Sequence, residues 1–149
     1  MKLETLMVDI KTAWLDFPGY EGFEVKVANL SRKELQALRK RCIKTRFDRK
    51  THQAVEEIDD DKFVQEFTKG TVKGWKGFKL KYVQDFVLID IQDNDPDTEL
   101  EYSHDSAVSL IQNSSEFDAW INEVVFDLAN FRRAAEKNDV PKTGNLAKK

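Results

Sequence analysis

Alternating apolar and polar positions near the N-terminus predict a β-hairpin. Residues 23–28 alternate with the period of a half-buried strand, and residues 13–17 show the same alternation before them. Between the two runs, Pro18 presets a φ suited to a turn and Gly19 accepts a positive one. The sequence therefore predicts two antiparallel strands joined by the loop 18–22.

A capping signal predicts that a helix begins at Ser31. Ser31 and Glu34 have the spacing of a capping box, in which each side chain accepts a hydrogen bond from the other residue's backbone N–H. Leu35, Leu38 and Cys42 then lie on one apolar stripe. Because Cys42 belongs to that stripe, we expect a packed thiol and not a nucleophile.

A second helix is predicted to begin near Asp59 and to end before Gly77. Asp60 and Asp61 are favourable in its first turn because they interact with the positive end of the helix dipole. Residues 45–57, which precede this helix, have no hydrophobic period. We expect them to form a loop or a short strand.

Two further helices are predicted in the second half of the chain. A short helix follows Ser103, and Ser115 is expected to cap a long helix whose apolar positions recur at helical spacing as far as Phe131. Residues 86–91 are apolar without a strict period. The acidic stretch 92–101 is typical of an exposed loop.

These elements predict an α+β fold, in which an N-terminal β-hairpin packs on a mainly helical bundle of about four helices. A chain of 149 residues fits one domain, and a hydrophobic fraction of 40% is enough for a core. We expect residues 1–135 to form this single globular domain. Residues 136–149 are polar, contain Pro141 and Gly144, and are expected to be a flexible basic tail.

Charge is strongly partitioned along the chain, although the formal net charge is only −3. Residues 1–81 carry 18 basic and 13 acidic side chains, whereas residues 82–131 carry 12 acidic side chains and no Lys or Arg. Residues 132–149 are basic again, with 6 basic and 2 acidic side chains. This partition predicts salt-sensitive contacts, either with a client protein or by self-association.

Side chains with catalytic or metal-binding chemistry do not form a recognisable motif. Residues 93–97 resemble the start of a calcium loop, but Thr98 and His104 occupy the positions where an EF-hand needs Gly and Glu. His52, His104 and Cys42 are too few for a structural zinc site. No triad signature or phosphate-binding loop is present either. The sequence therefore predicts a protein that is not an enzyme and that holds no metal or cofactor.

A basic stretch raises the alternative of nucleic-acid binding. Residues 32–50 contain nine Lys or Arg against only Glu34 and Asp48. Phe47 is the one aromatic residue among them, and the acidic half of the chain would repel a nucleic acid. Nucleic-acid binding is therefore disfavoured but kept as an alternative.

The sequence also favours a protein that stays in the cytoplasm. The single Cys42 excludes an intramolecular disulfide and is typical of a reducing compartment. Residues 1–9 carry charges where a signal peptide needs an apolar run. No stretch approaches the ~18 apolar residues of a membrane-spanning helix, so no membrane contact is expected.

Several motifs occur together in a recognisable order. They are Lys11-Thr12-Ala13-Trp14-Leu15-Asp16 before the Pro-Gly hairpin, Leu30-Ser31-Arg32-Lys33-Glu34-Leu35, Gly74-Trp75-Lys76-Gly77-Phe78, the helix from Ser103 to Ile111, and the helix from Glu116 to Arg132. Their order resembles that of the tail assembly chaperones of long-tailed, siphovirus-type bacteriophages and prophages. The resemblance covers about residues 11–133, and the Trp-Lys-Gly turn is its most specific part.

This resemblance implies a chaperone that binds the tape measure protein, and in some cases the tail tube subunit, before the tube polymerises. It implies a location in the host bacterial cytoplasm, absence from the mature virion, and a minor frameshifted product with an appended domain. The alternatives are a structural minor tail protein of the virion and a nucleic-acid-binding or regulatory phage protein.

Three residues are the candidate partner-binding site in the sequence. Trp75 lies between two glycines and has basic neighbours, a setting typical of an interface anchor. We therefore expect Trp75, Lys76 and Phe78 to contact the partner. Trp120, by contrast, lies on the apolar stripe of a predicted helix and is expected in the core.

Overall fold

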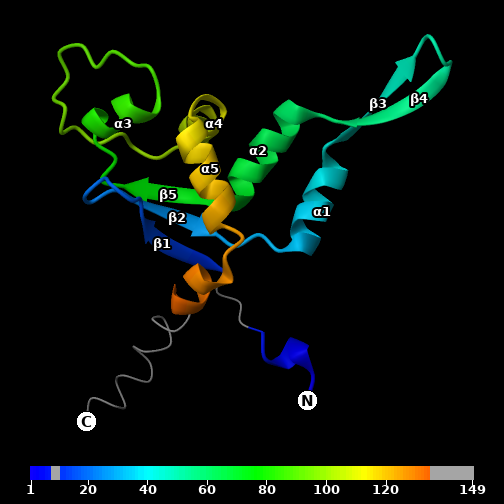
Figure 1. Cartoon of the computed structure of the whole chain (residues 1–149), viewed down its shortest axis with the longest axis horizontal. Helices are drawn as coiled ribbons and strands as arrows, with labels where there is room; N and C mark the ends of the chain where they lie inside the picture. The colour runs from blue at the N-terminus through cyan, green and yellow to red at the C-terminus, as the bar shows by residue number, and fades with distance from the viewer. Residues whose placement is uncertain (8–10, 135–149) are drawn as a thin grey trace.

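A three-stranded antiparallel sheet, a separate two-stranded hairpin and the helices around them give the chain an α+β fold (Figure 1). The computed structural model describes residues 1–7 and 11–134. In chain order the elements are η1 (a 3₁₀ helix, Leu3–Thr5), β1 (Thr12–Asp16), β2 (Glu24–Ala28), α1 (Arg32–Arg41), β3 (Ile43–Asp48), β4 (Gln53–Ile58), α2 (Asp60–Thr71), β5 (Val72–Lys76), α3 (Leu80–Phe86), α4 (His104–Asn113) and α5 (Ser115–Val124). Residues 128–134 are also helical. The tail predicted at residues 136–149 lies outside the described residues.

The predicted N-terminal hairpin is confirmed and forms two of the three strands. β1 pairs with β2 from Thr12↔Ala28 to Asp16↔Glu24, and β5 pairs with the other side of β2. The connecting loop includes Gly19, whose φ of 89° is one that glycine adopts without steric cost. The strand order is β1-β2-β5, so β1 is an outer strand of the sheet.

Helices α2, α4 and α5 lie together over one face of this sheet (Figure 1). α2 packs on α4, and α4 packs on α5. Because side chains alternate across a strand, Val25 and Val27 of β2 are fully buried while Glu24 and Lys26 remain half-exposed. The helices and the sheet thus share one hydrophobic core.

Five phenylalanines form the centre of that core, which we call the phenylalanine cluster: Phe17, Phe23, Phe78, Phe86 and Phe117. The Phe23 ring stacks on the Phe78 ring with centroids 4.2 Å apart, and Phe17 meets Phe86 edge to face at 5.1 Å. Phe86 also lies 6.3 Å from Phe117 of α5. The cluster therefore ties the β1–β2 loop to α3 and α5.

The helix starts predicted at Ser31, near Asp59 and after Ser103 are confirmed, and each of these three side chains accepts a backbone N–H of the first turn. At Ser31 the capping box is complete, because Glu34 accepts the Ser31 N–H at 3.1 Å in return. Lys11 from the start of β1 donates to the same carboxylate at 3.0 Å. The start of α1 is thereby connected to the sheet.

The prediction of a single long helix from Ser115 to Phe131 is wrong. Ser114, not Ser115, caps α5, and α5 ends at Val124. Asp127 then acts as the cap of the next helical segment, because its carboxylate accepts the N–H of Ala129 at 3.0 Å. The Val124 carbonyl at the end of α5 accepts hydrogen bonds from the Asn130 side chain and from the Asp127 N–H. The sequence did not indicate this break, because apolar positions recur at helical spacing through it as far as Phe131.

The predicted bundle of about four helices is also not what the structure shows. Its described part contains six bounded helices, η1 and α1–α5, arranged around a sheet. β5 and α3 were missed because a five-residue strand and a seven-residue helix are too short to show a period among three glycines.

Residues 45–57 form most of a hairpin, β3–β4, that projects to one side of the molecule (Figure 1). Its strands pair from Ile43↔Ile58 to Asp48↔Gln53. Because it is largely solvated on both faces, its sequence has no inside–outside alternation to detect. Phe47 is 60% exposed near its tip.

We predict that Gly77→Ala destabilises the protein by about 2–4 kcal/mol. Gly77 has a φ of 71°, and a Cβ there would overlap the carbonyl of Gly22 in the β1–β2 loop. Gly70→Ala is the matched control, because Gly70 lies in α2 with open space around it and should gain about 0.5 kcal/mol from helix propensity. Urea denaturation of both variants tests this, and equal effects would contradict the close approach of β5 to the loop.

We also predict that Glu34 contributes to stability in a pH-dependent manner. Partial burial raises its pKa, but the hydrogen bonds from Lys11 and Ser31 outweigh this and hold the pKa below its usual value of 4.5. The contribution is therefore complete above the unfolded-state pKa and is lost as pH falls through the lower folded-state pKa. The difference in unfolding free energy between wild type and Glu34→Gln should be larger at neutral pH than in acid. A difference that does not change with pH would contradict this.

Candidate binding groove along β1

Among the residues that the structure describes, no strand pairs with the outer edge of β1. The Phe17 N–H donates to the Phe23 carbonyl at 2.9 Å, and the Asn29 N–H donates to the Lys11 carbonyl at 2.8 Å. Antiparallel alternation then directs the backbone groups of Thr12, Trp14 and Asp16 away from β2. Within residues 1–7 and 11–134, no hydrogen bond from another element satisfies these groups. With respect to the described part of the chain, the edge is therefore available for backbone hydrogen bonding.

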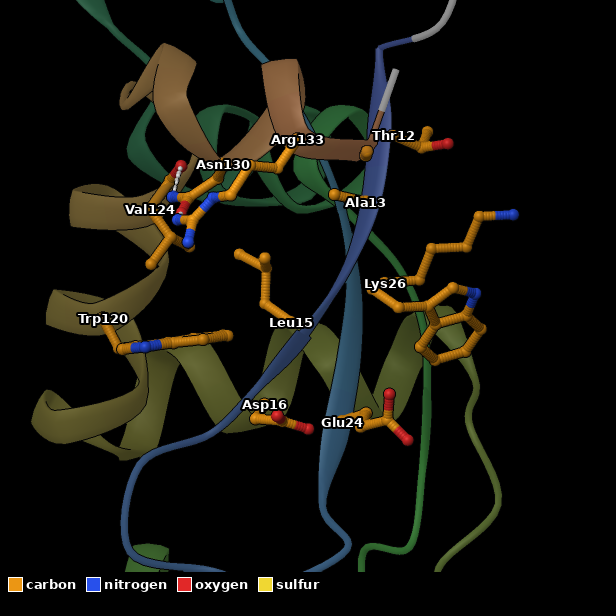
Figure 2. Close-up of a pocket in the computed structure, with 12 residues that line it drawn as sticks. Thr12, Ala13, Leu15, Asp16, Glu24, Lys26, Trp120, Val124, Asn130 and Arg133 are labelled. Carbon is orange, nitrogen blue, oxygen red and sulfur yellow. Dashed lines mark hydrogen bonds between the residues drawn. The ribbon is translucent and has the colours of Figure 1, made fainter. Parts of the chain in front are cut away.

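A groove of about 750 Å³ follows this edge, which we call the β1 groove (Figure 2). Its residues come from β1, β2, α5 and the helical segment 128–134: Thr12, Ala13, Trp14, Leu15, Asp16, Glu24, Lys26, Trp120, Val124, Asn130, Arg133 and Ala134. Figure 2 shows Leu15 and Trp120 facing each other across it, from the strand and from α5.

Trp120 forms the apolar wall of the groove on the helical side. It is half-buried, and its ring lies 4.6 Å from Phe17 and 6.4 Å from Phe117 between centroids. Val124, one helical turn further along α5, extends this wall. The phenylalanine cluster thus fixes the indole in position while leaving part of it free for contact.

Trp14 forms an aromatic surface on the other face of the sheet. Trp14 is 44% exposed, and its ring reaches across Lys26 to Gly74, where a Cβ would lie 3.8 Å from the indole. The Lys76 ammonium lies 4.6 Å from the centre of the Trp14 ring and 3.5 Å from the Glu24 carboxylate. These contacts orient the indole through a cation–π interaction and an ion pair.

Charge differs between the two ends of the β1 groove. Asp16 and Glu24 lie at the end of β1 that leads into the loop, and Arg133 lies near Thr12 at the opposite end (Figure 2). The Arg133 guanidinium donates to Asn130 at 3.3 Å, which holds it over the groove. The groove therefore presents an acidic end and a basic end.

The three residues predicted as a contact site do not form one surface. Trp75 is 6% exposed and its indole N–H donates to the Leu100 carbonyl, while Phe78 is fully buried in the phenylalanine cluster. Only Lys76 is on the surface, where it lies against Trp14. The signal for Trp14 was present in the sequence, since it occupies the polar phase of the alternation in residues 13–17.

Residues considered for catalytic or metal chemistry have structural partners instead. Cys42 is fully buried, and burial raises the pKa of its thiol, as expected for a packed cysteine. Asp59 caps α2, and Asp97 pairs with Lys81 at 2.9 Å and with Lys79 at 3.8 Å. Across the described part of the chain, no three His, Cys, Asp or Glu side chains are gathered as a metal site would need.

None of the helices in the described residues of this chain is both long and apolar enough to cross a lipid bilayer. Comparison of the chain with models of known protein families, with curated proteins and with solved structures found no match.

Proposed function

We propose that this protein is a tail assembly chaperone of a long-tailed bacteriophage, and that it binds the tape measure protein in the β1 groove. The observation that carries the proposal is an open strand edge lying between two tryptophans, Trp14 and Trp120. Such a groove offers backbone hydrogen bonds and apolar contact together, which is what peptide recognition at a sheet edge requires. The order of sequence motifs over residues 11–133 supplies the phage context.

The proposed role fits the chemistry of the groove. A tape measure protein is a long rod that must be kept soluble before the tail tube forms around it, so its chaperone must shield apolar segments from water. Leu15, Trp120 and Val124 provide apolar contact of this kind. In this role the protein acts in the host cytoplasm, is absent from the mature virion, contacts the tube subunit as a second partner, and has a longer frameshifted form.

Nucleic-acid binding is the second candidate, because of where the basic residues lie. α1 and the β3–β4 hairpin extend from one end of the molecule, whereas the chain after α3 lies at the other end (Figure 1). The acidic stretch 92–101 is therefore far from the basic surface and repels a ligand there only weakly in physiological salt. Ion pairs of Arg41 with Glu66 and of Arg46 with Glu57 neutralise part of this surface, which favours the chaperone role.

We predict that Trp14→Ser weakens binding of the tape measure protein by about 2 kcal/mol, close to 30-fold in Kd. Trp14 is a half-exposed anchor, so its loss should reduce client contact more than folding. Co-expression with the tape measure protein, followed by biolayer interferometry on the purified components, measures the effect. Thermal melting checks that the variant remains folded.

Phe47→Ser is the matched control, since Phe47 is an exposed aromatic residue of β3, and the β3–β4 hairpin projects away from the β1–β2–β5 sheet (Figure 1). It should leave client binding unchanged. If Phe47→Ser abolishes binding and Trp14→Ser does not, the client uses the β3–β4 hairpin instead. If the wild-type protein binds no tape measure protein, the proposed function is wrong.

A further inference from the structure

The sequence of β1 does not protect its own open edge. Natural proteins usually block such edges with proline, inward-pointing charge, a bulge or a covering element. Thr12–Asp16 contains neither proline nor lysine, and its pairing with β2 is regular along its whole length. A regular edge of this kind, with Trp14 at its centre, is a template for pairing with another strand.

The same sequence is complementary to itself when two copies are placed antiparallel. With Trp14 opposite Trp14 of the other copy, Ala13 lies opposite Leu15 and Thr12 lies opposite Asp16. Apolar positions therefore meet apolar positions on the face toward α5, and the two indoles are neighbours on the other face. No like charges lie opposite each other within the strand, so the register carries no electrostatic penalty.

The backbone groups are also in the correct phase for this register. Thr12, Trp14 and Asp16 direct their N–H and C=O groups outward, and they are the residues that the register pairs with each other. Each pair can then exchange two hydrogen bonds, as in a regular antiparallel ladder. In a register shifted by one residue, the outward N–H and C=O groups of one copy would lie opposite residues whose backbone groups point toward β2, and the ladder could not form.

Charge at the two ends of the β1 groove is compatible with the same partner. In the antiparallel arrangement, the end of β1 with Asp16 and Glu24 lies beside the end of the other copy near Thr12 and Arg133. The two carboxylates lie on the Trp14 face of the sheet, and the Arg133 guanidinium lies on the face toward α5. The opposite end of the interface repeats the same pairing by symmetry. The ends of the groove thus bring no like charges together when a second copy of the chain pairs with β1.

From these observations we propose that two copies of this protein pair through β1, antiparallel about Trp14, and form a six-stranded sheet in the order β5-β2-β1-β1-β2-β5. The dimer satisfies the open edge in the absence of a client. If the proposed function is correct, client and second copy compete for the β1 groove, but the dimer itself can be tested without any client.

Asp16→Pro is the discriminating variant. Proline removes the outward N–H of Asp16, which β1–β2 pairing does not use, and proline is tolerated on the solvent side of an edge strand. Asp16→Ala is the matched control, because it removes the same carboxylate and keeps the N–H. Sedimentation velocity over a dilution series should show a dimer for wild type, a dimer weakened only by the lost charge for Asp16→Ala, and a dissociation constant raised by at least about tenfold for Asp16→Pro.

A cross-link tests the register. In the proposed dimer the Trp14 residues form a hydrogen-bonded pair with Cα atoms about 5.5 Å apart, within the range that a disulfide can bridge. Trp14→Cys should therefore form an intermolecular disulfide on mild oxidation, and Lys76→Cys on the distant strand β5 should not.

Two results would overturn the proposal. One is a wild-type protein that is monomeric throughout the dilution series. The other is a dimer that Asp16→Pro leaves intact, because this would place the interface elsewhere, for example on the β3–β4 hairpin. Circular dichroism of Asp16→Pro shows whether the fold is retained, and if the variant unfolds, the Trp14→Cys cross-link decides alone. Neither result depends on binding of the tape measure protein.

Discussion

The arrangement of the phenylalanine cluster is the constraint on which the rest of the structure depends. Phe17 and Phe23 flank the β1–β2 loop, and they pack against Phe86 of α3 and Phe78 after β5. Truncation of one such buried ring typically costs ~3–5 kcal/mol, a large share of the ~5–15 kcal/mol that stabilises a domain. Because Phe17 also supports Trp120, the cluster sets the distance between β1 and α5. The width of the β1 groove is therefore a consequence of core packing.

Local signals in the sequence predicted the parts of the fold that are determined locally. The capping box at Ser31 and the helix starts near Asp59 and after Ser103 depend on residues close in sequence, and the structure confirms them. The β1–β2 hairpin follows from alternation and a five-residue loop. β5 could not be predicted in the same way, because it is specified by pairing with β2 across more than forty residues of chain.

The candidate site was harder to predict than the fold. Trp75 and Phe78 have sequence neighbours typical of a surface turn, but the pairing of Trp75 with Val25 and the close approach of Gly77 to Gly22 bring them into the core. Trp14 shows the opposite case, because its position in the alternation of β1 directs its side chain to the exposed face of the sheet. Whether an aromatic residue is exposed depends on which sheet face the helices cover, and a single chain's pattern does not specify that directly.

Amide hydrogen exchange at β1 tests the central claim most directly. In dilute, client-free protein, the amides of Trp14 and Asp16 should exchange quickly, while that of Leu15, which donates to β2, should be protected. Addition of the tape measure protein should slow exchange at Trp14 and Asp16 and leave Leu15 unchanged. If these two amides still exchange quickly in the complex, and protection appears in the β3–β4 hairpin instead, the β1 edge is not the client-binding surface.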